Sequence, residues 1–219
     1  MIALAASGLG EGHWLRADQQ SGGRGRMGRM WQSPPGNLYA STVVCLRVGD
    51  PPPATLALMT VVALAEVVAA YAPSAELMIK WPNDVLIGGA KLGGILLERS
   101  GDCVIVGIGA NLAHHPAGLD RAVTSLGAHG AVPDAAVFCE DLAGSFARWL
   151  DQWRGVGLAP VRKAWLDLAH PLGTALIANL SDGVSHAGLF DGLTDDGALR
   201  LRLADGRVHV IHAADVFLL

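Results

Sequence analysis

The segment QSGGRGRMGRMW, from Gln20 to Trp31, combines four glycines with three arginines in an otherwise acidic chain. No Asp or Glu occurs between Asp18 and Asp50. Glycines allow backbone N–H groups to approach an anion closely, and arginines supply forked, permanently charged donors. The segment therefore predicts a mobile clamp for a phosphate or a carboxylate.

Three other interpretations of this segment explain it less well. Gly23, Gly25 and Gly28 match the pattern GxGxxG, but that pattern should open a helix, and RMWQSPPGN follows instead. Nucleic-acid binding is disfavoured because the formal net charge is −4 and the basic residues form a single loop. A solvated flexible loop would explain the glycines but not the three arginines.

The distribution of lysines indicates a second element of the same site. The chain contains only three lysines but thirteen arginines, and Lys80 and Lys91 lie on either side of one expected hairpin. A compact ammonium on a flexible stem suits a site where a planar guanidinium does not fit. Each could alone be a surface lysine, but Asn83, Asp84 and the pair Gly93-Gly94 lie close by in the sequence. Glycines within a strand leave bare backbone on which a flat ligand can lie.

The elements that must position these residues follow from composition and periodicity. Half of the 219 residues are hydrophobic and only 16% are charged, as in a compact globular protein. Alternating and apolar runs predict strands at 14–17, 37–48, 77–81, 85–87, 91–98 and 103–112, and helices at 54–72, 138–153 and 160–168. After Pro171, short strands separated by the turns SDG, TDDG and ADG indicate a small β unit. We expect one domain over residues 1–170 and another over 171–219.

Apolar and cysteine-containing segments bear on location. Pro51 to Ala72 has the length of a membrane span, but Glu66 lies inside it, so a buried core helix of a soluble protein is expected. The N-terminus has no secretory pattern. Cys45, Cys103 and Cys139 are far apart and form no CxxC pair, which predicts reduced thiols in a cytoplasmic protein. No metal site is expected, and His114-His115 reads as a surface loop.

Four segments together resemble the biotin protein ligases, in that family's order and spacing. They are ADQQSGGRGRMGRMWQSPPGNLYAS (17–41), KWPNDVLI (80–87), KLGGILLE (91–98) and VGIGANL (106–112). The resemblance implies an α/β (α+β) catalytic domain with a mixed, mostly antiparallel sheet, followed by a small SH3-like β-barrel. It implies an ATP-dependent ligase that forms biotinyl-5′-AMP and transfers biotin to a lysine of a biotin carboxyl carrier protein domain. Biotin, ATP and Mg²⁺ would be the substrates and cofactor, and a homodimer is plausible.

Residue roles carried over by this resemblance stay with the segments above. Lys91, Arg24 and Arg26 would be catalytic, with Lys91 at the biotin carboxylate and the reacting phosphate. Gln20, Gly23 and Gly25 would complete the lining for biotin and the adenylate phosphate. The nucleotide side would comprise Lys80, Asn83, Asp84 and Asn111, with Trp31 near the adenine. Gly93 and Gly94 would also belong to the binding site, as the bare strand backbone described above.

The resemblance has one departure and leaves two alternatives. The family's Ser/Thr-Thr-Asn motif, which binds the biotin ring system, has no counterpart ahead of the loop. Either the natural start lies upstream or biotin affinity is reduced. The chain also has no room for the DNA-binding domain of relatives that act as repressors, so no nucleic-acid role is expected. The alternatives are a lipoate or octanoate transferase of the related fold and a truncated, non-catalytic biotin-binding protein.

Overall fold

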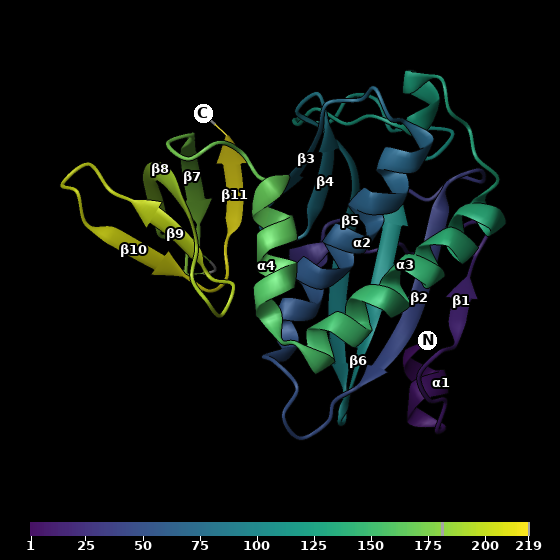
Figure 1. The fold of residues 1–219 in the computed structure, drawn as a ribbon. Helices are drawn as coiled ribbons and strands as arrows, with labels where there is room; N and C mark the ends of the chain where they lie inside the picture. The colour runs from purple at the N-terminus through teal and green to yellow at the C-terminus, as the bar shows by residue number, and fades with distance from the viewer. Residues whose placement is uncertain (181, 219) are drawn as a thin grey trace.

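Six antiparallel strands form the larger of two sheets in the computed structural model, which describes residues 1–180 and 182–218 (Figure 1). In spatial order they are β1 (Trp14–Arg16), β2 (Leu38–Cys45), β6 (Cys103–Ala110), β5 (Ala90–Ser100), β4 (Asp84–Ile87) and β3 (Leu77–Lys80). The nearly all-apolar strand β6 is central, as its composition predicts. Every adjacent pair is antiparallel, which confirms the predicted mostly antiparallel sheet.

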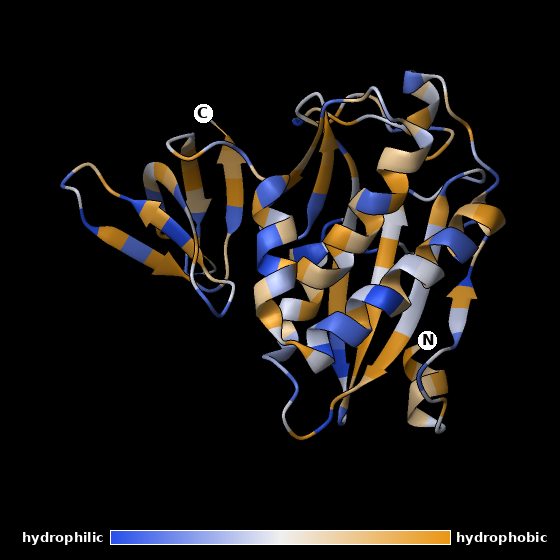
Figure 2. Ribbon diagram, in the orientation of Figure 1, coloured by the Kyte–Doolittle hydropathy of each residue, from blue (hydrophilic) through white to orange (hydrophobic). Residues whose placement is uncertain are grey.

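Three helices cover one face of this sheet: α2 (Leu56–Tyr71), α3 (Ala135–Gly155) and α4 (Leu158–Asp167). Together with its preceding turn, α2 is long and apolar enough to cross a membrane, but 72% of that window is buried inside the protein. It is therefore the core helix that the sequence predicts, and hydrophobic residues concentrate on it and on the strands beneath (Figure 2). The expected stripe of α3 is buried as well, at Phe138, Leu142, Phe146 and Trp153.

The C-terminal part folds into a separate five-stranded sheet, in the order β10-β9-β8-β7-β11. Its strands are β7 (Ala175–Asn179), β8 (Ser185–Leu193), β9 (Leu199–Arg202), β10 (Val208–Ile211) and β11 (Asp215–Leu218). The periodicity predicted the first four of these strands but not β11. Ser181, in the first predicted turn, and Leu219 lie outside the described residues. The domain boundary after residue 170 stays a prediction; it falls between the end of α4 and the start of β7.

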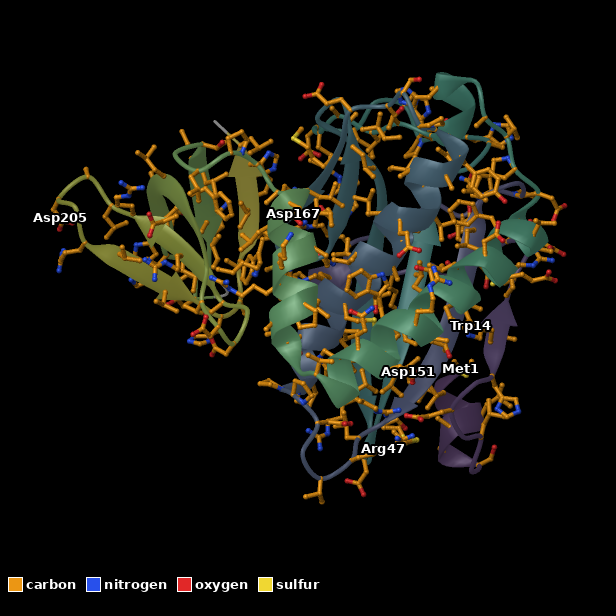
Figure 3. All side chains as sticks on the ribbon, viewed as in Figure 1. Met1, Trp14, Arg47, Asp151, Asp167 and Asp205 are labelled. Carbon is orange, nitrogen blue, oxygen red and sulfur yellow. A yellow bond between two sulfur atoms is a disulfide. The ribbon has the colours of Figure 1, made fainter. Side chains whose placement is uncertain are left out.

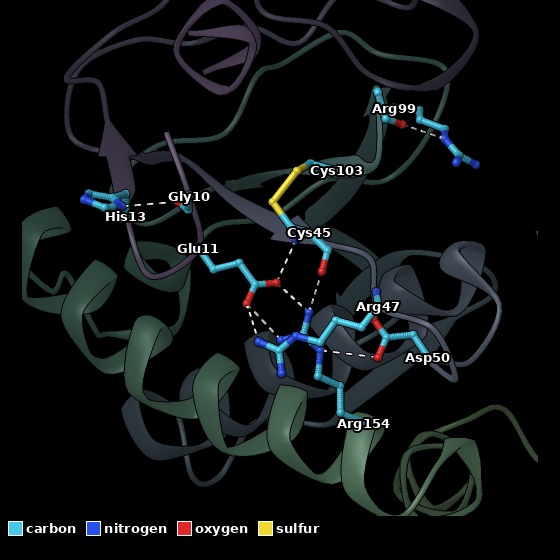
Figure 4. The surroundings of a disulfide bond; sticks show 10 residues. Gly10, Glu11, His13, Cys45, Arg47, Asp50, Arg99, Cys103 and Arg154 are labelled. Carbon is cyan, nitrogen blue, oxygen red and sulfur yellow. Dashed lines mark hydrogen bonds and ion pairs between the residues drawn. A yellow bond between two sulfur atoms is a disulfide. The ribbon is translucent and has the colours of Figure 1, made fainter. Parts of the chain in front are cut away.

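Two features differ from expectation. A short helix, α1 (Ile2–Ala6), precedes β1 and packs beside β5 and β6. The expectation of three reduced thiols is wrong for this structure, because Cys45 and Cys103 form a disulfide with a Cα–Cα distance of 4.0 Å (Figure 4). The cause is the register of β2 against β6, which places these two residues directly opposite each other. Cys139 is free and buried.

Candidate functional site

A cavity of about 360 Å³ lies on the face of the six-stranded sheet opposite the three helices. The alternation of β5 identifies this face: Gly94 lines the cavity, whereas a Cβ on Gly93 would meet Leu64 of α2. The wall also includes parts of the glycine loop, the β3–β4 hairpin, β2, β6 and β11. The volume falls within the usual range of small-molecule sites, roughly 300–1,000 Å³.

An aspartate between two lysines forms the charged floor of the cavity. The Nζ of Lys91 donates to Oδ1 of Asp84 at 2.5 Å, and the Nζ of Lys80 lies 3.3 Å from Oδ2. Burial alone would raise the pKa of Asp84, but the two ammonium groups outweigh it and hold that pKa below its usual range. Burial lowers the pKa of Lys91, against the opposing effect of Asp84. The hairpin that the sequence singled out therefore presents an ionised, fully paired carboxylate beside two cations.

Asn83 fixes the geometry of this hairpin. Its side-chain NH2 group donates to the backbone carbonyl oxygen of Ile95, and the backbone carbonyl oxygen of Asn83 accepts from the backbone N–H of Ile95. The turn between β3 and β4 is thereby tied to the neighbouring strand β5. Asp84, the next residue, is held at the cavity wall as a result.

The glycine loop folds back on itself between β1 and β2. The backbone N–H of Gly25 donates to the carbonyl oxygen of Arg29 at 2.7 Å, and that of Trp31 donates to Gly23 at 2.9 Å. A Cβ on Gly23 would lie 2.4 Å from the Trp31 carbonyl oxygen, so only glycine permits this closure. Gln20, at the entrance of the loop, accepts a hydrogen bond from Ser33. The loop brings Gln20, Arg24, Gly25, Arg26 and Arg29 to the cavity.

Trp31 forms an aromatic wall against bare backbone. A Cβ on Gly109 of β6 would lie 2.8 Å from the indole ring, so the ring packs directly on the strand. The Nζ of Lys91 lies 5.6 Å from the ring centroid. The indole Nε1 is buried and has no hydrogen-bond partner among the described residues. A flat ligand at this wall could stack on the ring or accept that hydrogen bond.

Most of the predicted site residues reach the cavity wall, but three do not. Gly23 acts within the loop, and Gly93 faces the core as described above. Asn111 is buried behind the wall, where its amide donates to the carbonyl oxygen of Thr124. Gly23, Gly93 and Asn111 thus lie outside the cavity lining, and their direct contacts with a ligand stay predictions. The residues that do line the cavity are Gln20, Arg24, Gly25, Arg26, Trp31, Lys80, Asn83, Asp84, Lys91 and Gly94.

Four charged residues of the wall, Arg29, Glu98, Arg121 and Asp215, are not among the predicted site residues, and the last two lie outside every segment that the sequence singles out. Arg121 follows β6 in a segment that runs beside β5, since the N–H of Lys91 donates to Ala122 and that of Thr124 donates to Lys91. The Nε of Arg121 is buried without a partner in the described part of the chain. Asp215 reaches the cavity from β11 of the other sheet. Arg121 and Asp215 belong to no recognisable sequence pattern, and they reach the cavity only because their segments fold beside it.

The charge balance of the wall indicates an anionic ligand. Three carboxylates, Asp84, Glu98 and Asp215, face six cationic side chains, Arg24, Arg26, Arg29, Lys80, Lys91 and Arg121. Such a wall can bind phosphate and carboxylate groups together and spread developing negative charge. Within residues 1–180 and 182–218, no three His, Cys, Asp or Glu side chains group as metal ligands.

Comparisons with known proteins cover both sheets. The family described as "Biotin/lipoate A/B protein ligase family" matches residues 11–111, and "Biotin protein ligase C terminal domain" matches residues 175–219. The chain is 43% identical to the biotin–[acetyl-CoA-carboxylase] ligase of Paracoccus denitrificans, over 97% of this chain and 92% of the relative. It is 33% identical to the ligase of the same name from Mycobacterium tuberculosis, over 99% and 83%. Its fold is similar to that of the biotin protein ligase from Aquifex aeolicus in complex with biotin and ATP, with a TM-score of 0.87, 24% identity and coverage of 96% and 91%.

Proposed function

The chain belongs to the biotin protein ligase family, and from this membership we propose that the cavity activates biotin with ATP and passes it to a carrier protein. The acceptor is a lysine of a biotin carboxyl carrier protein domain. One observation of the site supports the proposal most strongly: cations of the glycine loop and of the β3–β5 region line the same cavity as the indole ring of Trp31. A site of that composition suits two anions, one of which bears a flat base.

The first step joins the two anions. A biotin carboxylate oxygen attacks the α-phosphorus of ATP, an O–P bond forms, and the bond to the diphosphate breaks. The carboxylate is already ionised at neutral pH, so this step needs no general base. It needs proximity and compensation of charge, which we assign to Arg24, Arg26 and Lys91.

The second step transfers the acyl group. The carrier's lysine amine, in its neutral form, attacks the carbonyl carbon of biotinyl-5′-AMP and forms the new C–N bond. AMP leaves with the electron pair of the broken C–O bond, and the nitrogen releases one proton to solvent. This mixed anhydride hydrolyses easily, so a glycine-rich loop that closes over it has the function of excluding water. Arg24 and Arg26 lie on that loop.

Asp84 is better suited to positioning than to base catalysis. Both of its oxygens are already paired with lysines, and its pKa is held below the usual range. A carboxylate of depressed pKa is a weak proton acceptor near neutral pH. We therefore assign Asp84 the task of holding Lys80 and Lys91 in place for the nucleotide.

Mg²⁺ stays a prediction, and the residues present are compatible with it. Protein sites for Mg²⁺ often supply only one or two carboxylates, with substrate phosphates and water completing the shell. Asp84, at the cavity wall, could contribute one such oxygen, and the ion would supply additional charge neutralisation at the phosphates.

We place adenine against Trp31, which offers a flat face on the nucleotide side.

Intact mass spectrometry of a carrier domain tests this function. The domain is incubated with the protein, ATP, Mg²⁺ and either biotin or octanoate. We expect the mass of the carrier domain to increase with biotin and ATP, and to stay unchanged with octanoate and ATP. A shift with octanoate would favour the acyl-transferase alternative, and no shift with either acid would favour the non-catalytic one. A cytoplasmic location and a homodimer are further proposals, tested by fractionation and by light scattering.

A further inference from the structure

A contact between the two sheets engages the arginines of the glycine loop. Arg29 and Arg26 both pair with the carboxylate of Asp215 on β11, Arg26 at 3.8 Å from Oδ1. Nη1 of Arg26 also donates to the carbonyl oxygen of Ala214 at 3.1 Å. The loop and the C-terminal sheet are thus joined through the groups that face the cavity.

Asp215 lies on a paired strand, whereas its partners Arg26 and Arg29 lie in a glycine-rich loop whose backbone has more conformational freedom. β11 is paired with β7 over its whole length, with Asp215 opposite Asn179. The Asp215 side chain is 12% exposed and that of Arg29 is 42% exposed. The arginines belong to a loop with four glycines, so they can move while the carboxylate stays in place.

The carboxylate offers these arginines the same chemistry as a ligand phosphate. Guanidinium groups bind carboxylate and phosphate oxygens with the same forked geometry. Arg26 is half-buried, and burial lowers its pKa although the negative charge of Asp84 opposes this effect, so a further carboxylate beside the guanidinium is favourable. A carboxylate at the cavity edge removes that cost while no ligand is present.

We propose that Asp215 is a positioning residue that holds Arg26 and Arg29 at the cavity in the absence of ligand and releases them to the phosphate when it binds. The inference rests on the proposed function only for the identity of that phosphate. Arg26 and Arg29 would thus stay at the cavity before the ligand binds, and on binding they would exchange the carboxylate of Asp215 for the phosphate of the ligand. The C-terminal sheet takes part in ligand binding by supplying the first of the two anions.

A double-mutant cycle on the full chain tests the exchange. Asp215→Asn, Arg29→Gln and the double variant are digested with trypsin, and cleavage after Arg24 is followed by intact mass. This bond is present in all variants and lies in the exposed part of the loop. Asp205→Asn is the matched control, because Asp205 pairs with Arg207 in an exposed turn at the tip of the same sheet (Figure 3). Each variant is digested alone, with inorganic diphosphate, with ATP, and with biotin plus ATP.

Without ligand, we expect Asp215→Asn to be cleaved roughly tenfold faster than the parent chain, and Arg29→Gln by a smaller factor because Arg26 keeps its contact with Asp215. The double variant should be cleaved no faster than Asp215→Asn. Asp205→Asn should be cleaved at the parent rate. With a saturating phosphate ligand, all variants should regain protection through Arg26, and the coupling between positions 29 and 215 should fall to near zero.

Three outcomes would overturn the proposal. Additive effects without ligand would mean that the contact does not hold the loop. Full coupling in the presence of every phosphate probe would make Asp215 a fixed brace. Protection by ligand that requires Asp215 would make it part of the bound state. Because diphosphate and ATP are probes by themselves, failure of carrier biotinylation would leave this test intact and would refute only the proposed function.

Discussion

The two ends of the six-stranded sheet carry charged clusters of opposite character. At the cavity end, cations outnumber carboxylates, and Trp31 and Arg121 keep buried donors without partners among the described residues. At the other end, Glu11 and Asp50 are matched by Arg154 and Arg47 in a closed network (Figure 4). Nε of Arg154 also lacks a hydrogen-bond partner among the described residues, but it lies 3.5 Å from Oδ1 of Asp50. The first cluster therefore has an excess of positive charge, whereas the two arginines and two carboxylates of the second balance each other.

The backbone differs between the ends in the same way. Near the cavity, Gly94 and Gly109 leave the strands bare, so a ligand or an indole ring can lie on them. At the far end, the N–H of Cys45 donates to Glu11, and its carbonyl oxygen accepts from Arg154. An excess of one charge and bare backbone mark a site where binding energy is still to be gained, whereas charges that compensate each other within a cluster indicate a structural role.

Exchanging the cation type at the cavity end should have the largest effect. Lys91→Arg should reduce biotin ligation by about 100-fold or more, although it keeps the charge. The Nζ of Lys91 lies 2.5 Å from Oδ1 of Asp84. A Cβ on Gly94 would already lie 3.0 Å from that Nζ, so the larger, planar guanidinium of an arginine has no room here. Single-turnover formation of biotinyl-5′-AMP measures the loss. Turnover like that of the parent chain would remove the argument that this position requires a compact ammonium.

A methyl group on the bare strand should have the next largest effect. Gly109→Ala would place a carbon 2.8 Å from the Trp31 ring and force the ring to move. We expect the KM for ATP to rise about tenfold, as for the loss of one stacking contact, with a smaller change for biotin. Gly107→Ala adds the same group to the same strand at an ordinary 3.5 Å from Leu96. An equal rise in the ATP KM for both variants would contradict the role given to Trp31.

Most residues that the sequence singles out line one cavity, because the patterns that identify them are local. The loop 20–31 and the hairpin around Asp84 carry their residue types at short spacing, and the strands that hold them alternate clearly. Gly93 shows the limit of such patterns: two adjacent glycines on a strand face opposite sides, and their sequence does not reveal which one meets the ligand.

What the sequence did not predict depends on pairing between distant segments. β11 is only four residues long and has no turn signal of its own, yet it delivers Asp215 to the cavity. The cysteine pair is separated by 58 residues, and only the register of β2 on β6 brings the two together. Glu11, Asp50 and Arg154 meet for the same reason, since each comes from a different segment.

Exchanging the cation type at the far end should alter stability and not catalysis. Arg154→Lys would lose the paired contacts to Glu11 and the hydrogen bond to Cys45, at a cost of about 2 kcal/mol in the free energy of unfolding. Chemical denaturation measures this cost, and ligation should remain within about twofold of the parent chain because none of the cluster's four residues lines the cavity. Arg154→Lys and Lys91→Arg are opposite exchanges of cation type, one in each cluster, and the first should affect stability whereas the second should affect ligation. If both substitutions reduced activity alike, the two ends would not be independent.

The smallest effect on ligation is expected from the disulfide. Cys45 and Cys103 lie on strands that are already hydrogen-bonded, at the end away from the cavity, so the bond adds no geometry that the site needs. By chain entropy, closing a loop of 58 residues would nevertheless stabilise the fold by up to about 4 kcal/mol. The double variant Cys45→Ser, Cys103→Ser should therefore ligate biotin at the parent rate, and dithiothreitol should lower the melting temperature of the parent chain but not of the variant. A loss of ligation on reduction would couple the two ends of the sheet. Identical melting with and without dithiothreitol would mean that the thiols are reduced in solution, as the cysteine spacing first suggested.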